Sequence, residues 1–348
     1  MKKTIINILK IVIPVLLGVY ISWYFWTGFD DKQKDDFIKV FKQADYFWVG
    51  LALIIGFISH WSRSVRWKYA LKPLGYSPST YNSYNAIMIG YIANIVVPRM
   101  GEASRAGVLK ATDDIPFEKG FGSIVAERVI DVVCLGLVSG GALLFNLDKI
   151  DDLLNLASVI EANKSEGVTE PSTPWGLYIL GGLFILGLTT FAILWFKKPN
   201  FKEKVKNFIN GLKEGLVSIF KMEDRLPYLL HTLLIWTCYV AMFWVVFYAL
   251  PFTSILSIDA IMAGFVAGTI GFIVVQGGIG TYPLMVGAVI TFFRNPEVIA
   301  GGTIQGEDVG FGALVWASQT VLIVGLGLIS LFLVQKTKKK KKTLIKEN

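Results

Sequence analysis

The sequence predicts an all-α integral membrane protein that crosses the bilayer several times. Hydrophobic residues make up 53% of the 348 residues, charged residues make up 17%, and the mean hydropathy is +0.55. A soluble domain carries about 25% charged residues. Several apolar runs reach the roughly 20 residues that a helix needs to cross about 30 Å of hydrocarbon. Composition and run length together therefore argue against a soluble domain.

Eight strong apolar segments and one weaker segment follow one another along the chain. The strong ones lie near 5–26, 46–62, 121–146, 174–196, 227–250, 257–275, 278–293 and 308–334. The weaker one, 81–97, carries several asparagines, tyrosines and a serine. The first segment is longer than the roughly 7–15 apolar residues of a signal peptide, and it ends in aromatic residues that suit the membrane interface. We therefore interpret it as a retained membrane helix.

Lysines at the two ends of the chain predict that both termini are cytoplasmic. Lys2, Lys3 and Lys10 precede or begin the first segment, and Lys336 with 338–342 follows the last. Positive residues mark the cytoplasmic ends of membrane helices. The number of full crossings must then be even, so nine full crossings are excluded and eight fit. We expect one transmembrane domain over 1–335 and a basic cytoplasmic tail over 336–348.

The charge of the interior loops indicates that 81–97 enters the membrane and returns. Segment 148–173 has six acidic residues against two lysines, and segment 197–225 has eight basic residues against four acidic ones. A re-entrant hairpin near 81–110 places the first loop outside the cell and the second in the cytoplasm. Within the second, 200–222 has helical apolar spacing; it is either an amphipathic helix on the membrane surface or a solvated linker helix.

Glycines interrupt the apolar pair 257–275 and 278–293. Gly277, Gly278 and Gly280 predict either a tight turn between two crossings or the tip of a second re-entrant hairpin. The sequence thus leaves eight crossings, or six crossings and two hairpins. In the second case one hairpin enters from each side, which makes an inverted repeat of the kind that many transporters use.

Three charged residues inside the segment 121–146 are candidates for a functional site. Glu127, Arg128 and Asp131 lie three and four residues apart, so they share a helix face. Charges at membrane depth are costly unless they are paired or face water. We expect Arg99, Arg105 and Arg128 to bind a lipid phosphate through forked hydrogen bonds, with Glu102, Glu127 and Asp131 as orienting or ion-coupling carboxylates. The alternative is a structural lock between Arg128 and Asp131.

Other residues of chemical interest receive structural interpretations. Pro98 and Gly101 mark the predicted break in the first hairpin. Arg63 and Arg66 are interpreted as snorkelling side chains at a helix end. Two isolated cysteines and two isolated histidines predict neither a disulfide nor a metal site, and we expect no cofactor. The net charge of +8 lies beside apolar helices, so we expect anionic lipid and not nucleic acid as its partner.

The charged and glycine motifs together resemble the transmembrane family of lysyl-phosphatidylglycerol synthase, also called flippase-like, over roughly 5–335. The resemblance rests on Pro98-Arg99-Met100-Gly101-Glu102, Arg105, Leu109, Glu127-Arg128, Asp131 and Gly277-Gly278-Ile279-Gly280. It implies a polytopic protein whose bifunctional relatives move an aminoacylated phospholipid between leaflets and make it with a soluble domain. Val275-Gln276 and Tyr282-Pro283 around the glycines depart from the family pattern, which puts the substrate in doubt.

The function we expect is that of a lipid translocase in the cytoplasmic membrane. It would move a phospholipid or a polyprenyl-phosphate-linked lipid, with a separate enzyme synthesising that lipid. Because the chain ends at Asn348 soon after the last apolar segment, and because no Walker motif is present, we expect neither aminoacyl transfer nor ATP hydrolysis and no enzymatic activity. The alternative is a non-transporting membrane subunit or a lipid-modifying membrane protein.

Overall fold

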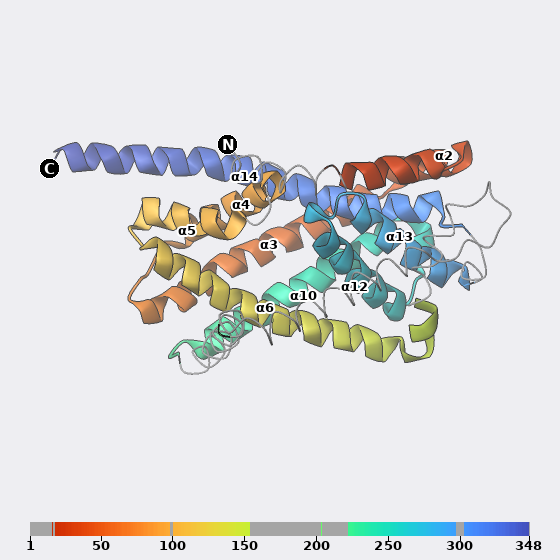
Figure 1. Ribbon diagram of the computed structural model, residues 1–348, viewed down its shortest axis with the longest axis horizontal. Helices are drawn as coiled ribbons and strands as arrows, with labels where there is room; N and C mark the ends of the chain where they lie inside the picture. The colour runs from red at the N-terminus through yellow and green to blue at the C-terminus, as the bar shows by residue number, and fades with distance from the viewer. Residues whose placement is uncertain are drawn as a thin grey trace.

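The computed structural model describes residues 16, 18–97, 100–153, 203, 222–296 and 303–347. Throughout these residues the regular structure is helical (Figure 1). The helices are α2 (Asp31–Gln43), α3 (Tyr46–Leu71), η1 (Lys72–Leu74), α4 (Thr80–Val96), α5 (Met100–Asp113), α6 (Phe117–Phe145), η2 (Leu147–Lys149), α10 (Arg225–Val246), η3 (Phe247–Ala249), α11 (Pro251–Ser254), α12 (Ile258–Val274), η4 (Gln276–Gly278), α13 (Thr281–Arg294) and α14 (Gly306–Glu347).

Several predictions fall on residues outside this described part of the chain. They are the start of the first apolar segment, the crossing 174–196, most of the loop 148–173, most of the helix 200–222, and Pro98 and Arg99. These stay predictions.

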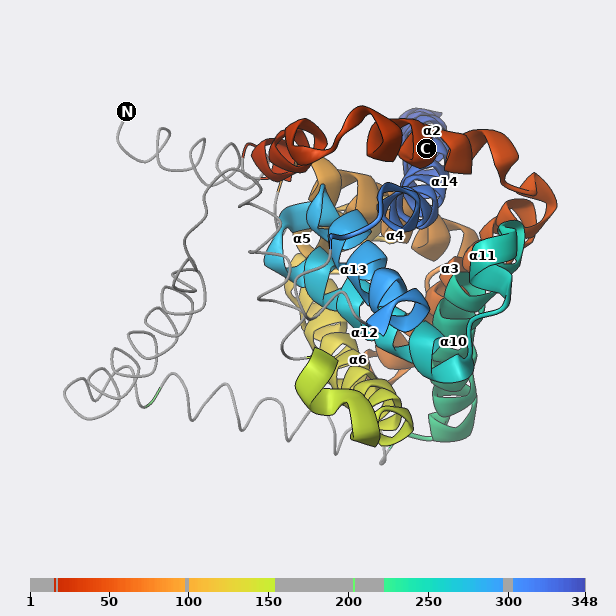
Figure 2. The same cartoon turned by 90° about the vertical axis from the view of Figure 1, so that its right-hand side faces the viewer.

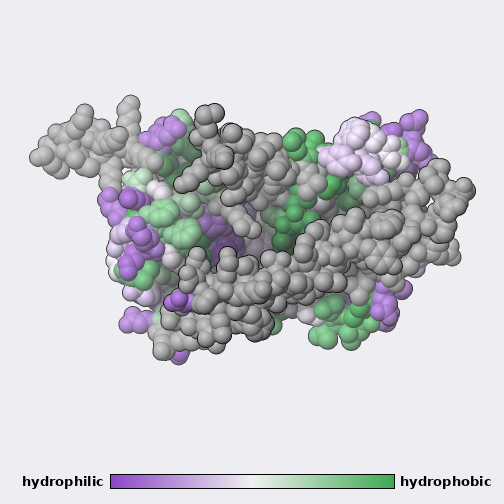
Figure 3. All heavy atoms as spheres, in the orientation of Figure 1, coloured by the Kyte–Doolittle hydropathy of each residue, from purple (hydrophilic) through white to green (hydrophobic). Residues whose placement is uncertain are grey.

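The described helices confirm an all-α polytopic membrane protein. Three helical stretches are long and apolar enough to cross a membrane, namely Phe117–Phe145, Arg225–Ala249 and Gly306–Thr337. Large apolar side chains on them face outward, with Leu137 71% exposed and Leu144 72% exposed. Figure 3 shows hydrophobic residues across the middle of the molecule and hydrophilic residues mostly toward its two ends. An outward apolar face of this kind requires lipid around it.

The antiparallel pair α3 and α10 defines two ends of the bundle. The backbone N–H of Asp45 donates to the carbonyl of Ala249 at 2.9 Å, which joins the start of α3 to the end of α10. Lys72 and Asp224 form an ion pair at 2.5 Å, which joins the end of α3 to the start of α10. We call these the Asp45 end and the Lys72 end. Figure 2 views the molecule from its right-hand side in Figure 1, with α14 seen nearly end-on.

The first hairpin consists of α4 and α5, and it opens at the Lys72 end. The side chain of Asn82 donates to Asp113 at 3.2 Å, so the outer ends of the two helices lie together. Lys68 of α3 donates to Thr80 at 3.1 Å, which fixes these outer ends near the end of α3. The 17 and 14 residues of α4 and α5 span about 25 Å and 21 Å, less than the hydrocarbon thickness of about 30 Å. The chain returns to the end from which it entered.

The second hairpin consists of α12 and α13, and it opens at the opposite, Asp45 end. Asn146, just after α6, donates to the carbonyl of Asp259 at 3.2 Å, and the Lys149 ammonium lies 5.3 Å from the ring of Phe293. The tip is made by the glycines, because Gly277, Gly278 and Gly280 have φ of 74°, 69° and 75°. Only glycine adopts this left-handed conformation without strain. The glycine motif at 277–280 therefore forms the turn at the tip of this hairpin.

The two hairpin tips approach each other inside the bundle. Asn94 and Ile95, near the end of α4, line the same cavity as Gly277 and Tyr282 from the second tip. Each hairpin thus begins and ends at one end, and the two enter from opposite ends. This is the arrangement that six crossings with two hairpins require, and an inverted repeat has the same form. Depth in the bilayer and the cytoplasmic position of the termini stay predictions.

The helices of the first hairpin pack closely through two glycines. A Cβ added at Gly101 would lie 2.5 Å from the carbonyl oxygen of Gly90 and would also meet the amide of Asn94. Gly101 lies in the first turn of α5, past the break where we had placed it, and its N–H donates to the Asn94 side chain at 2.7 Å. Because Gly101 has no side chain, α4 and α5 can pack closely at this position.

Replacing Gly101 with alanine is therefore expected to destabilise the protein by about 1–3 kcal/mol, because the added methyl overpacks a backbone contact. Gly107→Ala is the matched control on the same helix, since nothing lies within 4 Å of a Cβ at Gly107. We expect this control to be neutral or slightly stabilising. Thermal unfolding in detergent measures both variants, and equal stability of the two would contradict the close packing.

Candidate functional site

Five buried charged side chains from three helices form a cluster in the half of the bundle toward the Lys72 end. Arg63 donates to Glu127 at 2.6 Å and to Asp131 at 2.9 Å. Arg66 donates to the same two carboxylates at 2.7 Å and 2.9 Å, and Arg105 donates to Glu127 at 2.9 Å. We call these residues, Arg63, Arg66, Arg105, Glu127 and Asp131, the buried ion-pair cluster. It ties α3 and the first hairpin to α6.

Residue spacing explains why the cluster forms. Arg63 and Arg66 lie three apart on α3, and Glu127 and Asp131 lie four apart on α6, so each pair shares one helix face. When the two faces meet, two forked guanidinium groups contact two carboxylates. The Arg105 guanidinium lies 4.3 Å from the ring of Trp67, which provides a cation–π contact on its other side.

The interpretation of Arg63 and Arg66 as snorkelling side chains is wrong. Arg63 is 2% exposed and Arg66 is 0% exposed, and both are paired with carboxylates of α6. The physical reason is that two carboxylates in a membrane helix need cations beside them. The spacing of the two residue pairs could have predicted this pairing from the sequence. Two arginines three residues apart on one helix can each contact two acidic residues four residues apart on another.

Arg128 and Glu102 differ from the cluster because they are held loosely. The side chain of Arg128 is 41% exposed, and its Nε lies 3.7 Å from Glu102 Oε1. Its Nη1 lies 3.6 Å from Asp131 Oδ2, which is an ion pair outside hydrogen-bond distance. The predicted lock between Arg128 and Asp131 is therefore weak, and the buried ion-pair cluster makes the tight contacts. Arg128 is free to reorient toward another anion.

A cavity of 520 Å³ lies between the two hairpin tips, and we call it the central cavity. Residues from α3, α4, α5, α6, α10, α12, α13 and α14 line it, so all the described long helices except α2 contribute. Its charged lining residues are Arg63, Arg128, Glu102 and Asp131. A volume of this size falls within the roughly 300–1,000 Å³ of small-molecule sites.

The charges at this site do not balance. Four arginines face three carboxylates when Arg128 and Glu102 are counted with the buried ion-pair cluster, which leaves one positive charge uncompensated. The Nε of Arg128, which lines the central cavity, also finds no hydrogen-bond partner among the described residues. Buried donors and surplus positive charge favour an anion, because the low dielectric strengthens its binding.

The predicted site residues divide into groups. Arg128, Glu102 and Asp131 line the central cavity, whereas Arg105 and Glu127 lie in the cluster beside it and do not line it. Gly277 lines the cavity from the second tip. Arg99 and Pro98 lie outside the described residues. The central cavity and the buried ion-pair cluster are thus adjacent, and they share Arg63 and Asp131.

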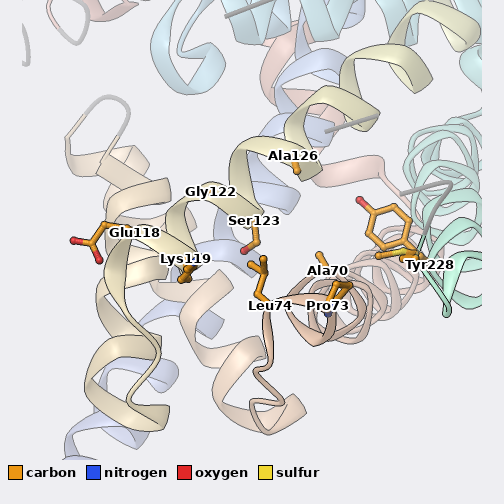
Figure 4. A pocket seen from close by; sticks show the side chains of 10 residues that line it. Ala70, Pro73, Leu74, Glu118, Lys119, Gly122, Ser123, Ala126 and Tyr228 are labelled. Atoms are coloured by element: carbon orange, nitrogen blue, oxygen red, sulfur yellow. The ribbon is translucent and has the colours of Figure 1, made fainter. Parts of the chain in front are cut away.

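A second, smaller pocket of 270 Å³ opens between α3, α6 and α10 toward the Lys72 end. Figure 4 shows the Tyr228 side chain with its hydroxyl directed toward Ala126, whereas Glu118 points away from the other labelled side chains. Tyr228 is buried, and the Arg66 guanidinium lies 5.5 Å from its ring. This pocket lies behind the cluster, and its lining includes no residue of the central cavity.

One contact resembles a catalytic pair that the sequence did not suggest. Ser62 Oγ lies 2.8 Å from His231 Nδ1, joining α3 to α10. Activation of a serine needs a base that is oriented by a third group and a cavity for the substrate. In the described part of the chain no carboxylate hydrogen-bonds to His231, and neither residue lines a described pocket. The contact is a hydrogen bond between two helices.

Comparison with known families matches the model of the lysylphosphatidylglycerol synthase TM region to residues 11–327. The match spans both hairpins, the buried ion-pair cluster and the central cavity.

The chain belongs to this family.

Three curated relatives are similar to parts of this chain. Glycosyltransferase AglD of Haloferax volcanii is 33% identical over 141 residues, which are 40% of this chain and 22% of AglD. The UPF0104 membrane protein MJ1595 of Methanocaldococcus jannaschii is 32% identical over 37% of this chain and 36% of its own length. The UPF0104 membrane protein PH1989 of Pyrococcus horikoshii is 25% identical over 78% of this chain and 83% of its own.

The match covers well under half of the length of the first two relatives. No solved structure matches the chain.

Proposed function

We propose that this protein moves a phosphate-bearing lipid between the two leaflets of the cytoplasmic membrane. The observation that carries the proposal is the position of Arg128. Its half-exposed side chain lines the central cavity, where the tips of two oppositely directed hairpins meet. A cation at this place can bind a phosphate while the acyl or prenyl tails stay in the surrounding lipid.

The arginines differ in how tightly they are paired with carboxylates, and this difference supports the proposed function. Arg63, Arg66 and Arg105 are held by Glu127 and Asp131, so they fix the positions of α3, α5 and α6. Arg128 has no carboxylate within hydrogen-bond distance. In this proposal the buried ion-pair cluster is the rigid wall of the site, and Arg128 supplies the hydrogen bonds to the phosphate. The uncompensated positive charge of the group attracts the headgroup.

The two hairpins provide a route from either side. The first hairpin opens at the Lys72 end and the second at the Asp45 end, and their tips share one cavity. Movement of one hairpin against the other would expose the central cavity first to one leaflet and then to the other, which is alternating access around a fixed site. The hydrogen bond from Trp316 Nε1 to the carbonyl of Gly277, 2.7 Å long, holds the second tip against α14 and has to break or shift in such a movement.

A liposome assay tests the proposal. The full chain is reconstituted into vesicles that contain a trace of fluorescent phospholipid labelled on an acyl chain, and a membrane-impermeant reductant bleaches the outer leaflet. Translocation predicts that more than the outer half of the label is bleached, at a rate that depends on protein density. Bleaching that stops at half, as in protein-free vesicles, would overturn the proposed function. A lipid that lacks phosphate is the control substrate, and we expect the protein to accelerate its movement less than that of the phospholipid.

A lipid-modifying enzyme is the second candidate, and the similarity to glycosyltransferase AglD favours it. The matched region is 22% of that protein, so the name describes mostly sequence that this chain does not match. The same vesicles distinguish the two functions. A nucleotide-sugar donor is added, and mass spectrometry of the extracted lipids then shows an added sugar mass if the chain transfers a glycosyl group to lipid and an unchanged mass if it only moves lipid.

A further inference from the structure

The central cavity continues beyond Arg128 as an uncharged polar wall. Nitrogen atoms of His60, Trp236 and Gln319 are buried without a hydrogen-bond partner among the described residues, and all three residues line the central cavity. They come from α3, α10 and α14. Polar groups left unpaired inside a protein cost stability, and most such groups find partners. A ligand is one source of the missing partners.

His60 and Gln319 extend from the arginines toward the Asp45 end, and Trp236 lies near Arg63. His60 precedes Arg63 by three residues, one turn of α3 closer to the Asp45 end. Gln319 lies a further turn along, because a Cβ at Gly56 would be 3.2 Å from its Oε1. The ring of Trp236 lies 5.8 Å from that of Tyr239, whose hydroxyl accepts from Arg63 at 2.9 Å. A headgroup whose phosphate meets Arg128 therefore extends along this polar wall.

The wall residues His60, Trp236 and Gln319 carry no carboxylate. Among the described lining residues the carboxylates are Glu102 and Asp131. Asp131 already accepts from Arg63 and Arg66, and Glu102 faces Arg128. An ammonium group has only N–H donors, and the unpaired nitrogens of Trp236 and Gln319 are donors as well, so the wall offers these groups no hydrogen bond to an ammonium. Burying an unpaired charge is strongly unfavourable.

We infer that the headgroup of the lipid beyond its phosphate is uncharged and bears hydroxyl groups. Hydroxyl oxygens accept from the indole of Trp236 and the amide of Gln319, and hydroxyl hydrogens can meet the ring nitrogen of His60. Aromatic rings of Tyr91 and Trp236 in the same wall suit the C–H faces of a polyol. Two sources share this chemistry: the glycerol of a phosphatidylglycerol-type lipid and a glycosyl group on a polyprenyl phosphate.

This inference rests on the proposed function for the position of the phosphate, but it is tested by binding alone. The purified full chain in detergent is titrated with short-chain phosphatidylglycerol, glucosyl-phosphoprenol, phosphatidic acid and lysyl-phosphatidylglycerol, and native mass spectrometry gives the bound fractions. We expect one or both of the hydroxyl-bearing lipids to bind at least about tenfold more tightly than the lysyl lipid. Comparing the two identifies the source of the hydroxyl groups. Equal or tighter binding of the lysyl lipid would overturn the inference.

Two variants locate the selectivity. Trp236→Phe removes the indole N–H and keeps an aromatic ring, and Gln319→Leu removes the amide. Each is expected to weaken binding of the hydroxyl-bearing lipid about five- to tenfold and to change binding of phosphatidic acid less than about twofold. Trp23→Phe, at an exposed position on the outer surface, is the control and should change neither. Equal losses for both lipids would assign the two residues to packing and would contradict the inference.

The outcomes separate the two proposals. Selective binding without movement in the vesicle assay refutes translocation and retains the headgroup preference. Movement with unselective binding refutes the headgroup preference and retains translocation. Failure of every phosphate lipid to bind refutes the headgroup preference, whatever the vesicle assay shows.

Discussion

Replacing Glu127 with alanine is expected to lower the free energy of unfolding by about 3–5 kcal/mol. Glu127 accepts hydrogen bonds from Arg63, Arg66 and Arg105 at 2.6 to 2.9 Å, and it is buried. Without it, Arg63 and Arg66 keep Asp131 as their carboxylate partner, and Arg105 loses the carboxylate with which it is paired. Removing one partner from a buried ion pair costs much more than the net worth of the pair, because the remaining charge stays desolvated. Unfolding in mixed micelles, followed by circular dichroism, measures the change.

Glu102→Ala is the matched control for that experiment. The side chain of Glu102 is 28% exposed and its nearest ion-pair distance to Arg128 is 3.7 Å, so its loss should cost less than about 1 kcal/mol. Glu127→Gln keeps the shape of the side chain and removes the charge, which provides a measurable variant if the alanine protein does not accumulate. Stability of the glutamine variant within 1 kcal/mol of the wild type would show that the cluster does not lock the helices.

Replacing Arg128 with alanine is expected to slow lipid movement at least about tenfold and to leave folding nearly unchanged. Hydrogen bonds between charged groups contribute about 1.5–3 kcal/mol, and 1.36 kcal/mol corresponds to a factor of ten in rate. The side chain of Arg128 is half-exposed and its carboxylate contacts are longer than hydrogen bonds, so little native stability is lost with it. The vesicle assay gives the rate, and thermal unfolding gives the stability.

Two further substitutions make the Arg128 experiment specific. Arg128→Lys keeps the charge but loses the forked geometry, so we expect an intermediate rate. Arg225→Ala removes an exposed arginine at the start of α10, outside the central cavity, and should leave the rate unchanged. Equal rates for the wild type and Arg128→Ala would remove Arg128 from the site.

Two properties of the sequence predicted much of the fold: the length of the apolar runs, which must match the membrane thickness, and the positions of the glycines, which break helices. Apolar run length predicted α6, α10 and α14 close to their observed positions, because a spanning helix needs about 20 apolar residues. The glycines at 277–280 predicted the break between α12 and α13. Charge counting in the loops pointed to the unusual path of 81–97. Each of these signals lies within a short stretch of residues, so it can be recognised in a single sequence.

Partner choice among charged residues could be predicted less well, because it depends on which helix faces meet. The sequence placed Glu127 and Asp131 correctly on one face, but it did not show that α3 lies against that face. As a result Arg63 and Arg66 were assigned to the interface with water, although they are the main partners of the two carboxylates. Arg105 was expected to bind a lipid phosphate, which stays a prediction; its pairing with Glu127 and its contact with the ring of Trp67 were not foreseen together.

The most direct test is a structure of the full chain determined by electron cryomicroscopy in lipid nanodiscs that contain the phosphatidylglycerol-type or glycosyl-phosphoprenol lipid that binds best. The proposed function predicts density for a phosphate within hydrogen-bond distance of the Arg128 guanidinium, in the central cavity between the two hairpin tips. A central cavity without lipid headgroup density, with ordered headgroups only at the outer surface of the bundle, would contradict it.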